Sequence, residues 1–522
     1  MRKIIYIPLD ERPCNYDFPA FLAAGTDYHV VRPDLSIMGL KKRPGDIEQL
    51  WAWLFEQAQD ADGAIVALDT LLYGGIIPSR LHGLTEEQCG EQLERLRQLK
   101  RINPALHVFA YQLIMRCPRY SSSDEEPDYY EDWGREIFRR GYIRHRLELG
   151  IATEEEQSEL QQIEAALPES IWHDYTKRRS VNLAANKRAI ELVQDGAVDF
   201  MIIPQDDSAP YGLTAVDQQH VREHVKKCQQ QLSVYMYPGA DEVGCTLLAR
   251  MINHFERRKP RVHVHFASVQ GPLVIPLYED RVLYESVKYQ IMAAGGLMSP
   301  SLAEADMALC INTPGESMME SNDQGQPYLG YQVYRNLVEL IEMADDIVHR
   351  LGKPCVIADV AYANGADLEL LQLLRDKKLL FELAGYAGWN TSGNTLGTCI
   401  AQGMIYAVYG NTQQHRDFLS LRYVEDGGYC ASVRRDVSDR VLPGMGYNYF
   451  SIDGQRGQIA ERVRAELTRF IEKHLNDPEN NYEIVIDDCY MPWSRMFEVG
   501  LKTHVRDTKQ ENDKVRQGFE LR

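Results

Sequence analysis

The sequence predicts an α/β protein whose sheet is mainly parallel. Short apolar runs recur along the chain, and each one stops at a cluster of acids, amides, glycines and prolines, as in IIYIPLDERP (4–13) and FMIIPQDDSAPYG (200–212). Runs of this kind are typical of strands buried on both faces. Helical periodicity fills the segments between them, and helical crossovers join parallel neighbours.

Taken in order, the apolar runs predict ten core strands, at 3–9, 29–32, 63–69, 107–113, 199–205, 233–237, 261–267, 306–312, 355–360 and 382–388. Helices are expected between them, including 46–59, 85–101, 281–294 and 332–351. Eight strands close a β/α barrel, whereas two doubly wound lobes would share all ten. We favour a β/α-barrel-like core, because the polar clusters recur at strand ends over so much of the chain.

Length and composition indicate the domain organisation. A chain of 522 residues exceeds one ordinary core. We expect an α/β core formed by residues 1–120 and 196–400. Residues 121–195, rich in Glu, Arg and Gln, are expected to be a helical insertion, and residues 401–522 a mostly helical C-terminal region. A terminal strand is predicted at 482–486, and the charged end from Val505 is expected to fray.

Composition also excludes several kinds of partner. A formal net charge of -19 argues against nucleic acid. The sequence has no window near the roughly 18 apolar residues of a membrane span, and the N-terminus lacks the pattern of a signal peptide. Ten scattered cysteines without a CxxC motif suit reduced thiols. We therefore expect a cytoplasmic protein with a small-molecule or carbohydrate partner, and the sequence leaves a homo-oligomer open.

The strongest candidate for catalysis is PQDDSAPYG (204–212), where Asp206 and Asp207 follow a predicted strand. Such a pair suits general acid/base chemistry, and the alternative is an Asx-turn that caps the next helix. Asp241 and Glu242 in YPGADEVG (237–244) come next. There the alternative is a helix cap followed by a first-turn acid.

Other strand ends carry side chains suited to binding a substrate. LDERP offers two acids and an arginine, and the segment from 69 to 80 adds an acid, a tyrosine, two glycines and another arginine; the alternatives are a structural ion pair and a plain glycine-rich turn. AGWNTSGNTLG (387–397) suits a hydroxylated ligand with tryptophan as a stacking face, or a phosphate loop, or a capped turn. The substrate-binding candidates are Asp10, Glu11, Arg12, Asp69, Tyr73, Arg80, Tyr211, Asp359, Asn364, Trp389, Asn390 and Asn394.

Together these loops predict a hydrolase, most simply a glycosidase-like enzyme that uses carboxylate acid/base catalysis on a carbohydrate or another hydroxylated small molecule. The six strand-end loops belong to the segments 4–13, 64–75, 200–212, 234–244, 355–367 and 383–397. None of them contains histidine, which disfavours a Ser/His/Asp triad and a His-rich zinc site. We expect no cofactor. One alternative makes Asp10, Asp69, Asp206 and Asp207 the ligands of a divalent cation in a metal hydrolase. The other is a non-catalytic sugar-binding protein.

Several of these motifs also point to a known family. YIPLDERPCN, PQDDSAPYG, PGADEVG, AGWNTSGNTLGT and the late PWSRMFEVG (492–500) resemble, together and over nearly the whole chain, a bacterial family catalogued as a domain of unknown function, number four-one-two-seven. The resemblance implies a bacterial protein and adds Trp493, Arg495 and Glu498 as site candidates. It implies no reaction and no assigned catalytic residue.

Overall fold

A computed structural model describes residues 1–476 and 482–507. The chain divides into two compact units. The first consists of Met1–Tyr16, Asp27–Leu247 and Tyr278–Arg281, and the second of Asp17–Thr26, Leu248–Leu277 and the described residues from Val282 onward. Each unit has its own parallel sheet, which confirms the predicted α/β class. The described strands form these two open sheets and two smaller two-stranded sheets, with no closed barrel among them, so the two-lobed alternative describes them better.

The sheet of the first unit has six parallel strands in the order β2-β1-β3-β4-β5-β6. Ile5 of β1 pairs with Val31 of β2 on one side and with Ala64 of β3 on the other. The chain thus moves from β1 to one neighbour and returns to the other side, which makes the β1–β3 boundary a topological switch point. The strands are β1 (Arg2–Ile7), β2 (Tyr28–Val31), β3 (Gly63–Ala67), β4 (His107–Tyr111), β5 (Phe200–Gln205) and β6 (Val234–Pro238).

The sheet of the second unit repeats this strand order, as β8-β7-β9-β11-β13. Its switch point lies between β7 and β9, which pair in parallel through Val264 and Leu309 among others. The strands are β7 (Arg261–Phe266), β8 (Leu297–Ser299), β9 (Met307–Asn312), β11 (Cys355–Asp359) and β13 (Gly385–Ala387). A short parallel pair, β10 (Met319–Glu320) and β12 (Tyr362–Ala363), lies beyond the carboxyl ends of β9 and β11 in the chain.

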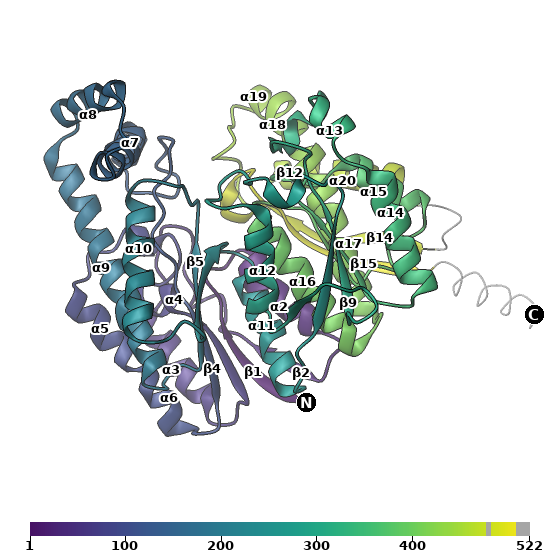
Figure 1. The fold of residues 1–522 in the computed structure, drawn as a ribbon, viewed down its shortest axis with the longest axis horizontal. Coiled ribbons are helices and arrows are strands. Elements are labelled where there is room, and N and C mark those ends of the chain that lie inside the picture. Colours follow the sequence, from purple (N-terminus) through teal and green to yellow (C-terminus); the bar gives the residue numbers. More distant parts are fainter. Residues whose placement is uncertain (477–481, 508–522) are drawn as a thin grey trace, which may run out of the picture. The chain divides into compact units, whose positions relative to one another are not determined.

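Helices of the first unit cover one face of its sheet (Figure 1). Ile5, Ile7, Val66 and Val108 point into the core beneath them, because side chains alternate between the two faces of a strand. The helices are α1 (Pro13–Tyr16), α3 (Ile47–Ala58), α4 (Leu68–Tyr73), η1 (Pro78–Arg80), α5 (Glu86–Glu94), α6 (Leu96–Ile102), α7 (Tyr130–Glu148), α8 (Glu154–Ala166), α9 (Glu169–Gln194) and α10 (Leu213–Lys227). The segment expected as a helical insertion contains α7, α8 and α9.

The second unit contains most of the remaining helices. α16 packs on β9, β11 and β13, while α14 packs on β9. The elements are α2 (Phe18–Ala23), η2 (Gly271–Leu273), α12 (Leu283–Ala293), η3 (Ser321–Asp323), α13 (Leu329–Val333), α14 (Leu337–Asp345), η4 (Asp346–Arg350), α15 (Leu368–Asp376), α16 (Ser392–Tyr409), α17 (Gln413–Arg422), η5 (Tyr423–Val433), α18 (Arg434–Arg440), α19 (Leu442–Met445), α20 (Gln458–Phe470), η6 (Ile471–Leu475) and η8 (Pro492–Ser494), while α11 (Val243–Phe255) begins in the first unit. Within the described residues, no helix has both the length and the apolar character to cross a membrane.

The C-terminal region ends in an antiparallel pair, β14 (Tyr482–Tyr490) and β15 (Gly500–Asp507). The strand predicted at 482–486 is therefore present and longer than expected, and its partner β15 was not predicted. Val505 pairs with Ile484, and the strand continues to Asp507. The expectation that the chain frays from Val505 is therefore wrong for residues 505–507. The rest of that tail, 508–522, lies outside the described residues.

Candidate functional site

Four of the six polar loops lie at the carboxyl edge of the first sheet. Asp10 follows β1, Asp69 lies in the first turn of α4 just after β3, Asp206 and Asp207 follow β5, and Asp241 follows β6. They gather there because parallel strands all end at the same edge of a sheet. The other two loops, after β11 and β13, lie at the corresponding edge of the second sheet.

Arg12 joins the loops after β1 and β6. Its Nε donates to Oδ2 of Asp10 at 2.8 Å and its Nη2 to Oδ1 of Asp241 at 2.6 Å. The side-chain amide of Asn15, which is fully buried, donates to both carboxylates, at 3.0 and 2.8 Å. Burial raises the pKa of Asp10 although Arg12 opposes the rise, and the charge of Asp241 adds to it. This geometry matches the structural ion pair that the sequence left open, and Asp241 contacts Arg12 in addition to any capping role.

A close backbone approach supports this ion pair. Tyr6, which is 1% exposed, donates from its hydroxyl to the carbonyl of Asn15 at 2.6 Å. Gly244 lies so near that an added Cβ would stand 2.2 Å from that hydroxyl oxygen. The position of Asn15, and through it of Asp10 and Asp241, therefore depends on glycine at 244.

We expect Gly244→Ala to lower the free energy of unfolding by about 1 to 3 kcal/mol, because a methyl group must displace a buried tyrosine ring. Urea denaturation measures the change. Gly90→Ala is the matched control, since Gly90 also lies in a helix and nothing would lie within 4 Å of its Cβ. That variant is expected to gain about 0.5 to 1 kcal/mol. Equal stability of the two variants would contradict the close approach.

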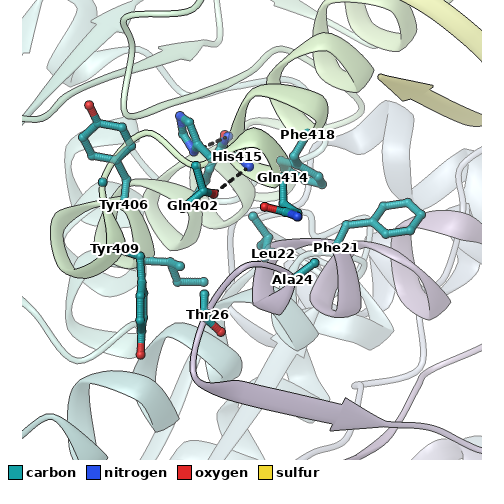
Figure 2. Close-up of a pocket in the computed structure, with 13 residues that line it drawn as sticks. Phe21, Leu22, Ala24, Thr26, Gln402, Tyr406, Tyr409, Gln414, His415 and Phe418 are labelled. Carbon is teal, nitrogen blue, oxygen red and sulfur yellow. Dashed lines mark hydrogen bonds between the residues drawn. The ribbon is translucent and has the colours of Figure 1, made fainter. Parts of the chain in front are cut away.

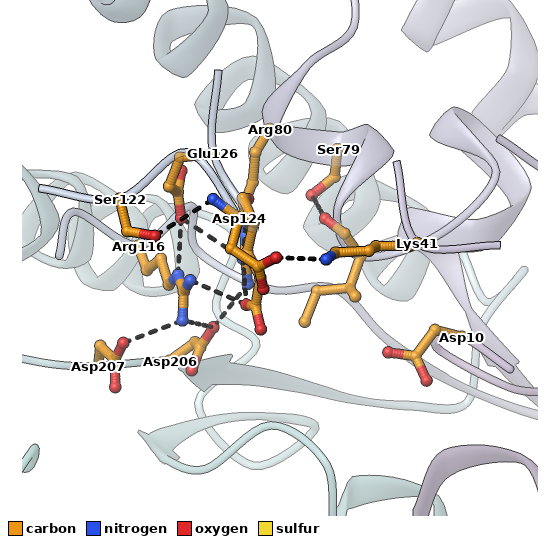
Figure 3. A network of polar contacts seen from close by, with 12 residues as sticks. Asp10, Lys41, Ser79, Arg80, Arg116, Ser122, Asp124, Glu126, Asp206 and Asp207 are labelled. Atoms are coloured by element: carbon orange, nitrogen blue, oxygen red, sulfur yellow. Dashed lines mark hydrogen bonds and ion pairs between the residues drawn. The ribbon is translucent and has the colours of Figure 1, made fainter. Parts of the chain in front are cut away.

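Beside this ion pair lies a larger network, here called the Arg80–Arg116 cluster, which also contains Glu125, Glu126, Asp206 and Asp207. Figure 3 shows the two arginines with Glu126, Asp206 and Asp207. Arg80 donates to Asp206 at 2.9 Å and contacts Glu125 at 3.1 Å. Arg116 donates to Asp207 at 3.1 Å and contacts Glu126 at 2.8 Å. Arg116 also contacts the carboxylate of Glu125, at 2.9 Å, so Glu125 forms ion pairs with both arginines. The cluster thus links the loop after β5 to segments that follow α4 and β4.

The charges of this cluster do not balance. Two guanidinium groups, on side chains only 3% and 9% exposed, face four carboxylates. Burial, and then the charge of Asp207, raises the pKa of Asp206 to about 6, although Arg116 and Arg80 oppose the rise. One oxygen of Glu126, Oε2, is buried without a hydrogen-bond partner among the described residues. The cluster is therefore suited to hold or release a proton near neutral pH.

Three candidate residues adopt a left-handed backbone conformation. The φ angle is 45° at Asp207, 62° at Asn364 and 53° at Asn390. Asp and Asn tolerate this region better than most residues with a side chain, and such conformations concentrate at functional sites. Asp207 adopts this conformation directly after Asp206. The left-handed backbone at Asp207 therefore determines the direction in which its own carboxylate points.

Asp69 lies beside the switch point of the first sheet. It is 2% exposed and accepts a hydrogen bond from the backbone amide of Leu113 at 2.9 Å. Burial raises its pKa to about 7. The next residue, Thr70, donates to the carbonyls of Pro8 and Leu9 at 2.7 and 2.9 Å, which ties the start of α4 to the loop after β1.

The remaining candidates of the first unit have structural contacts. Tyr73 belongs to the hydrophobic core and stacks on His82 with ring centroids 4.4 Å apart. Tyr211 packs edge-on against Tyr142. Glu11 accepts a hydrogen bond from the backbone amide of Lys41, and the buried Glu242 accepts one from that of Ala240.

The candidates of the second unit surround the ends of β11 and β13. Asp359 accepts hydrogen bonds from Asn312 at 2.9 Å and from the hydroxyl of Tyr386 at 3.0 Å. Burial, and then the charge of Asp367, raises the pKa of Asp359 to about 7. The backbone amide of Asn364 donates to the carbonyl of Asn390 at 2.8 Å, so the two loops are joined.

Trp389 is only 7% exposed, so the expectation of an exposed stacking face is wrong. Its indole nitrogen donates to Thr398 at 3.3 Å, and its ring lies edge-on to Phe18 at 5.9 Å. Asn394 is buried in the first turn of α16, whose cap is Thr391. Of the late motif, Arg495 is buried, pairs with Glu498 at 3.1 Å and lies 4.4 Å over the ring of Trp493.

A small cavity in the second unit lies between α2, α16 and α17 (Figure 2). Its volume is about 20 Å³, enough for a single water molecule. Gln402 lies 3.3 Å from Nδ1 of His415, and burial lowers the pKa of that histidine to about 4. This cavity has no room for a substrate.

Among the described residues, no three His, Cys, Asp or Glu side chains form a group that could hold a metal ion. The carboxylates proposed as ligands have other partners instead. Arginines hold Asp10, Asp206 and Asp207, and a backbone amide donates to Asp69.

Sequence reasoning missed Arg116, Glu125, Glu126 and Asn15. Arg116 follows the strand predicted at 107–113, so counting that strand end with the other six would have found it. Glu125 and Glu126 lie in the loop that precedes the predicted helical insertion, where no strand precedes them directly. No local signal distinguishes them from ordinary loop acids, because only the folded chain brings them to Arg80.

The fold and this edge define a doubly wound α/β protein with a mostly buried cluster of arginines and carboxylates. A family model described as "Protein of unknown function (DUF4127)" matches residues 4–502. The chain belongs to this family, which confirms the resemblance seen in its motifs. A search of curated proteins gives no match to this chain.

Proposed function

We propose that the protein is a hydrolase, glycosidase-like in mechanism, that acts on a carbohydrate or another hydroxylated small molecule at the carboxyl edge of its first sheet. The observation that carries the proposal is Asp206, whose pKa is raised to about 6 and whose immediate neighbour is a second carboxylate. Glycoside hydrolysis needs one carboxyl group that retains its proton and one carboxylate beside it.

The contacts of Asp206 and Asp207 suggest a separate role for each of the two carboxyl groups. The side chains of Asp206 and Asp207 are 19% and 24% exposed, so a substrate can reach both. In this proposal Asp206 donates its proton to the leaving oxygen, and Asp207 serves as base or nucleophile. The two Oδ2 atoms lie 4.0 and 3.1 Å from the same nitrogen of Arg116. This shared nitrogen favours the short carboxyl separation of about 5 to 5.5 Å that accompanies retention of configuration.

The surrounding charges support this division of roles. Arg80 and Arg116 hold the two carboxylates in place, and a buried, hydrogen-bonded guanidinium fixes orientation as well as charge. Asp241, held by Arg12, raises the pKa of Asp206 through its charge. The Arg12 ion pair thus acts on Asp206 at a distance, and Asp10 and Asp241 are positioning residues in this proposal.

Screening chromogenic nitrophenyl glycosides with the full-length protein tests the proposal. Asp206→Asn and Asp207→Asn are each expected to lower kcat/KM at least about 100-fold, the scale of general acid/base catalysis. Because Asp206 must be protonated to act as the acid, wild-type kcat/KM should fall as the pH rises through about 6. Asp128→Asn is the control, since that side chain is 98% exposed. Activity that survives both Asp206→Asn and Asp207→Asn would reject the assignment.

The metal-dependent alternative predicts a different result. In it the same carboxylates would ligate Mg²⁺ or Mn²⁺, which their arginine contacts do not favour. We expect the glycosidase activity to survive dialysis against EDTA without loss. Activity that disappears with EDTA and returns with Mg²⁺ or Mn²⁺ would support the alternative instead.

A further inference from the structure

The second unit contains a cavity of about 650 Å³, bounded entirely by its own residues. One wall is formed by the segment from Tyr331 to Val338, and the other by Tyr362, Asp367 and the first turns of α15. The volume falls within the range of small-molecule sites, about 300 to 1,000 Å³. The carboxylates of the proposed catalytic site are not part of it.

The cavity lies at the switch point of the second sheet. The backbone amide of Asn336, which lines it, donates at 2.8 Å to the carbonyl of Ala267, the residue that follows β7. Arg335, which also lines it, donates at 3.1 Å to the side chain of Asn312 at the end of β9. Strands β7 and β9 flank the point where the strand order reverses, and open α/β sheets bind their ligands in the crevice there. Cavity and topology therefore indicate the same place independently.

A buried arginine supplies hydrogen-bond donors to this cavity. The Arg335 side chain is 3% exposed, its Nη1 donates to Asp367 at 2.5 Å, and its Nε donates to the carbonyl of Tyr331 at 2.8 Å. Its Nη2 makes no hydrogen bond to any described residue, and a carboxylate oxygen of Glu369 lies 3.9 Å from it. The guanidinium is thus held in place by its other nitrogens while Nη2 keeps its capacity to donate, so this nitrogen is suited to a ligand oxygen.

The other lining groups indicate the kind of ligand. Tyr331 and Tyr362 both line the cavity and stack on each other, with centroids 4.5 Å apart and planes 7° from parallel, so they add aromatic surface to it. Amide side chains of Gln332, Asn336 and Gln372 supply further donors and acceptors, whereas the amide of Gln324 is engaged by backbone groups of the protein. The positive charge of Arg335 lies beside the negative charges of Asp367 and Glu369, which also line the cavity. The site therefore does not favour an anion. Amide side chains, an arginine whose charge is paired and the aromatic surface of two tyrosines suit a neutral ligand that carries many hydroxyl groups.

We propose that the second unit binds a neutral, polyhydroxylated small molecule, a sugar or polyol, in this cavity, with Nη2 of Arg335 as a donor to one of its oxygens. The proposal does not depend on catalysis by Asp206. Such a site would let the second unit recognise a sugar whether or not the first unit hydrolyses one.

Isothermal titration calorimetry and saturation-transfer NMR of the full chain test this with glucose, galactose, N-acetylglucosamine, myo-inositol, maltotriose and cellotriose. The Asp206→Asn variant serves as the background, so that turnover does not interfere. We expect at least one probe to bind with about one site per chain and a Kd in the micromolar to millimolar range. Gln372→Trp, which fills the cavity from its rim, should weaken binding at least about tenfold.

Glu369→Ala, at a rim side chain that is 70% exposed, should also weaken binding. Glu304→Ala is its matched control, since Glu304 is 64% exposed, pairs with an arginine and does not line the cavity. The proposal is overturned if no probe binds at about 10 mM. It is equally overturned if binding persists unchanged in Gln372→Trp, or if inorganic phosphate binds in the cavity and the sugars do not. Loss of glycosidase activity in Asp206→Asn with sugar binding intact would separate this site from the catalytic one.

Discussion

Replacing Arg116 with methionine is expected to lower the free energy of unfolding by about 3 to 5 kcal/mol, because removing one partner of a buried ion pair leaves uncompensated charge. Arg116 contacts Glu125, Glu126 and Asp207, and its side chain is only 9% exposed. After the substitution, Arg80 alone would face the four carboxylates of the Arg80–Arg116 cluster. Urea denaturation at neutral pH, followed by tryptophan fluorescence, measures the loss.

Two further variants show whether the loss comes from charge. Glu126 is buried, so Glu126→Gln in the Arg116→Met background removes one of the four negative charges that Arg80 alone would face, and it should recover at least about 1 kcal/mol. Arg135→Met is the surface control, since that side chain is 58% exposed, and it should cost under about 1 kcal/mol. If Arg116→Met costs no more than Arg135→Met, the cluster does not contribute to stability as its contacts suggest.

Replacing Asp69 with asparagine is expected to make the protein more stable than wild type at pH 8, by a difference in the free energy of unfolding that shrinks as the pH falls to 4.5. Burial raises the pKa of Asp69 from 3.8 to about 7. Between these values the unfolded chain releases a proton that the folded protein keeps. The stability contributed by the protonated carboxyl is thus complete below about pH 4 and is lost as the pH rises to about 7. Asparagine does not ionise, so the variant should avoid a loss of about 2 to 4 kcal/mol.

Urea denaturation at several values between pH 4.5 and 8 measures the difference in slope. Asparagine retains a carbonyl oxygen, so it can still accept the hydrogen bond from Leu113. Asp34→Asn is the control. Asp34 is exposed and a hydrogen bond from Ser36 lowers its pKa, so its charge does not change in this range. Parallel pH profiles for Asp69→Asn and wild type would show that Asp69 is ionised throughout, contrary to its burial.

The core strands could be predicted closely, because each is a short apolar run with a turn signal at its end. The run at 199–205 became β5 (Phe200–Gln205), and the run at 355–360 became β11 (Cys355–Asp359). β15 (Gly500–Asp507) was missed because, apart from glycine, its residues GLKTHVRD include only two apolar side chains, Leu501 and Val505, so it contains no apolar run. Such a strand is defined by the partner beside it, here β14.

The candidate site was only partly predictable. Asp10, Asp69, Asp206 and Asp241 were identified because each lies just after a strand, and parallel strands bring such positions to one edge. The contacts between them were not predictable. Nothing near Asp206 in the sequence indicates Arg80 or Arg116, and nothing near Trp389 indicates Phe18, the ring that covers it.

The sequence by itself determined the class of the fold, the places where strands end and the acidic character of the loops there, because these properties depend on local periodicity and composition. Only the tertiary structure decided that the strands divide into two sheets with the same order, that Arg116 joins the acids of the first, and that a cavity lies at the switch point of the second. Strand order, ion pairs and cavities all depend on which distant segments meet. That choice is made by packing over the whole chain, which no local pattern contains.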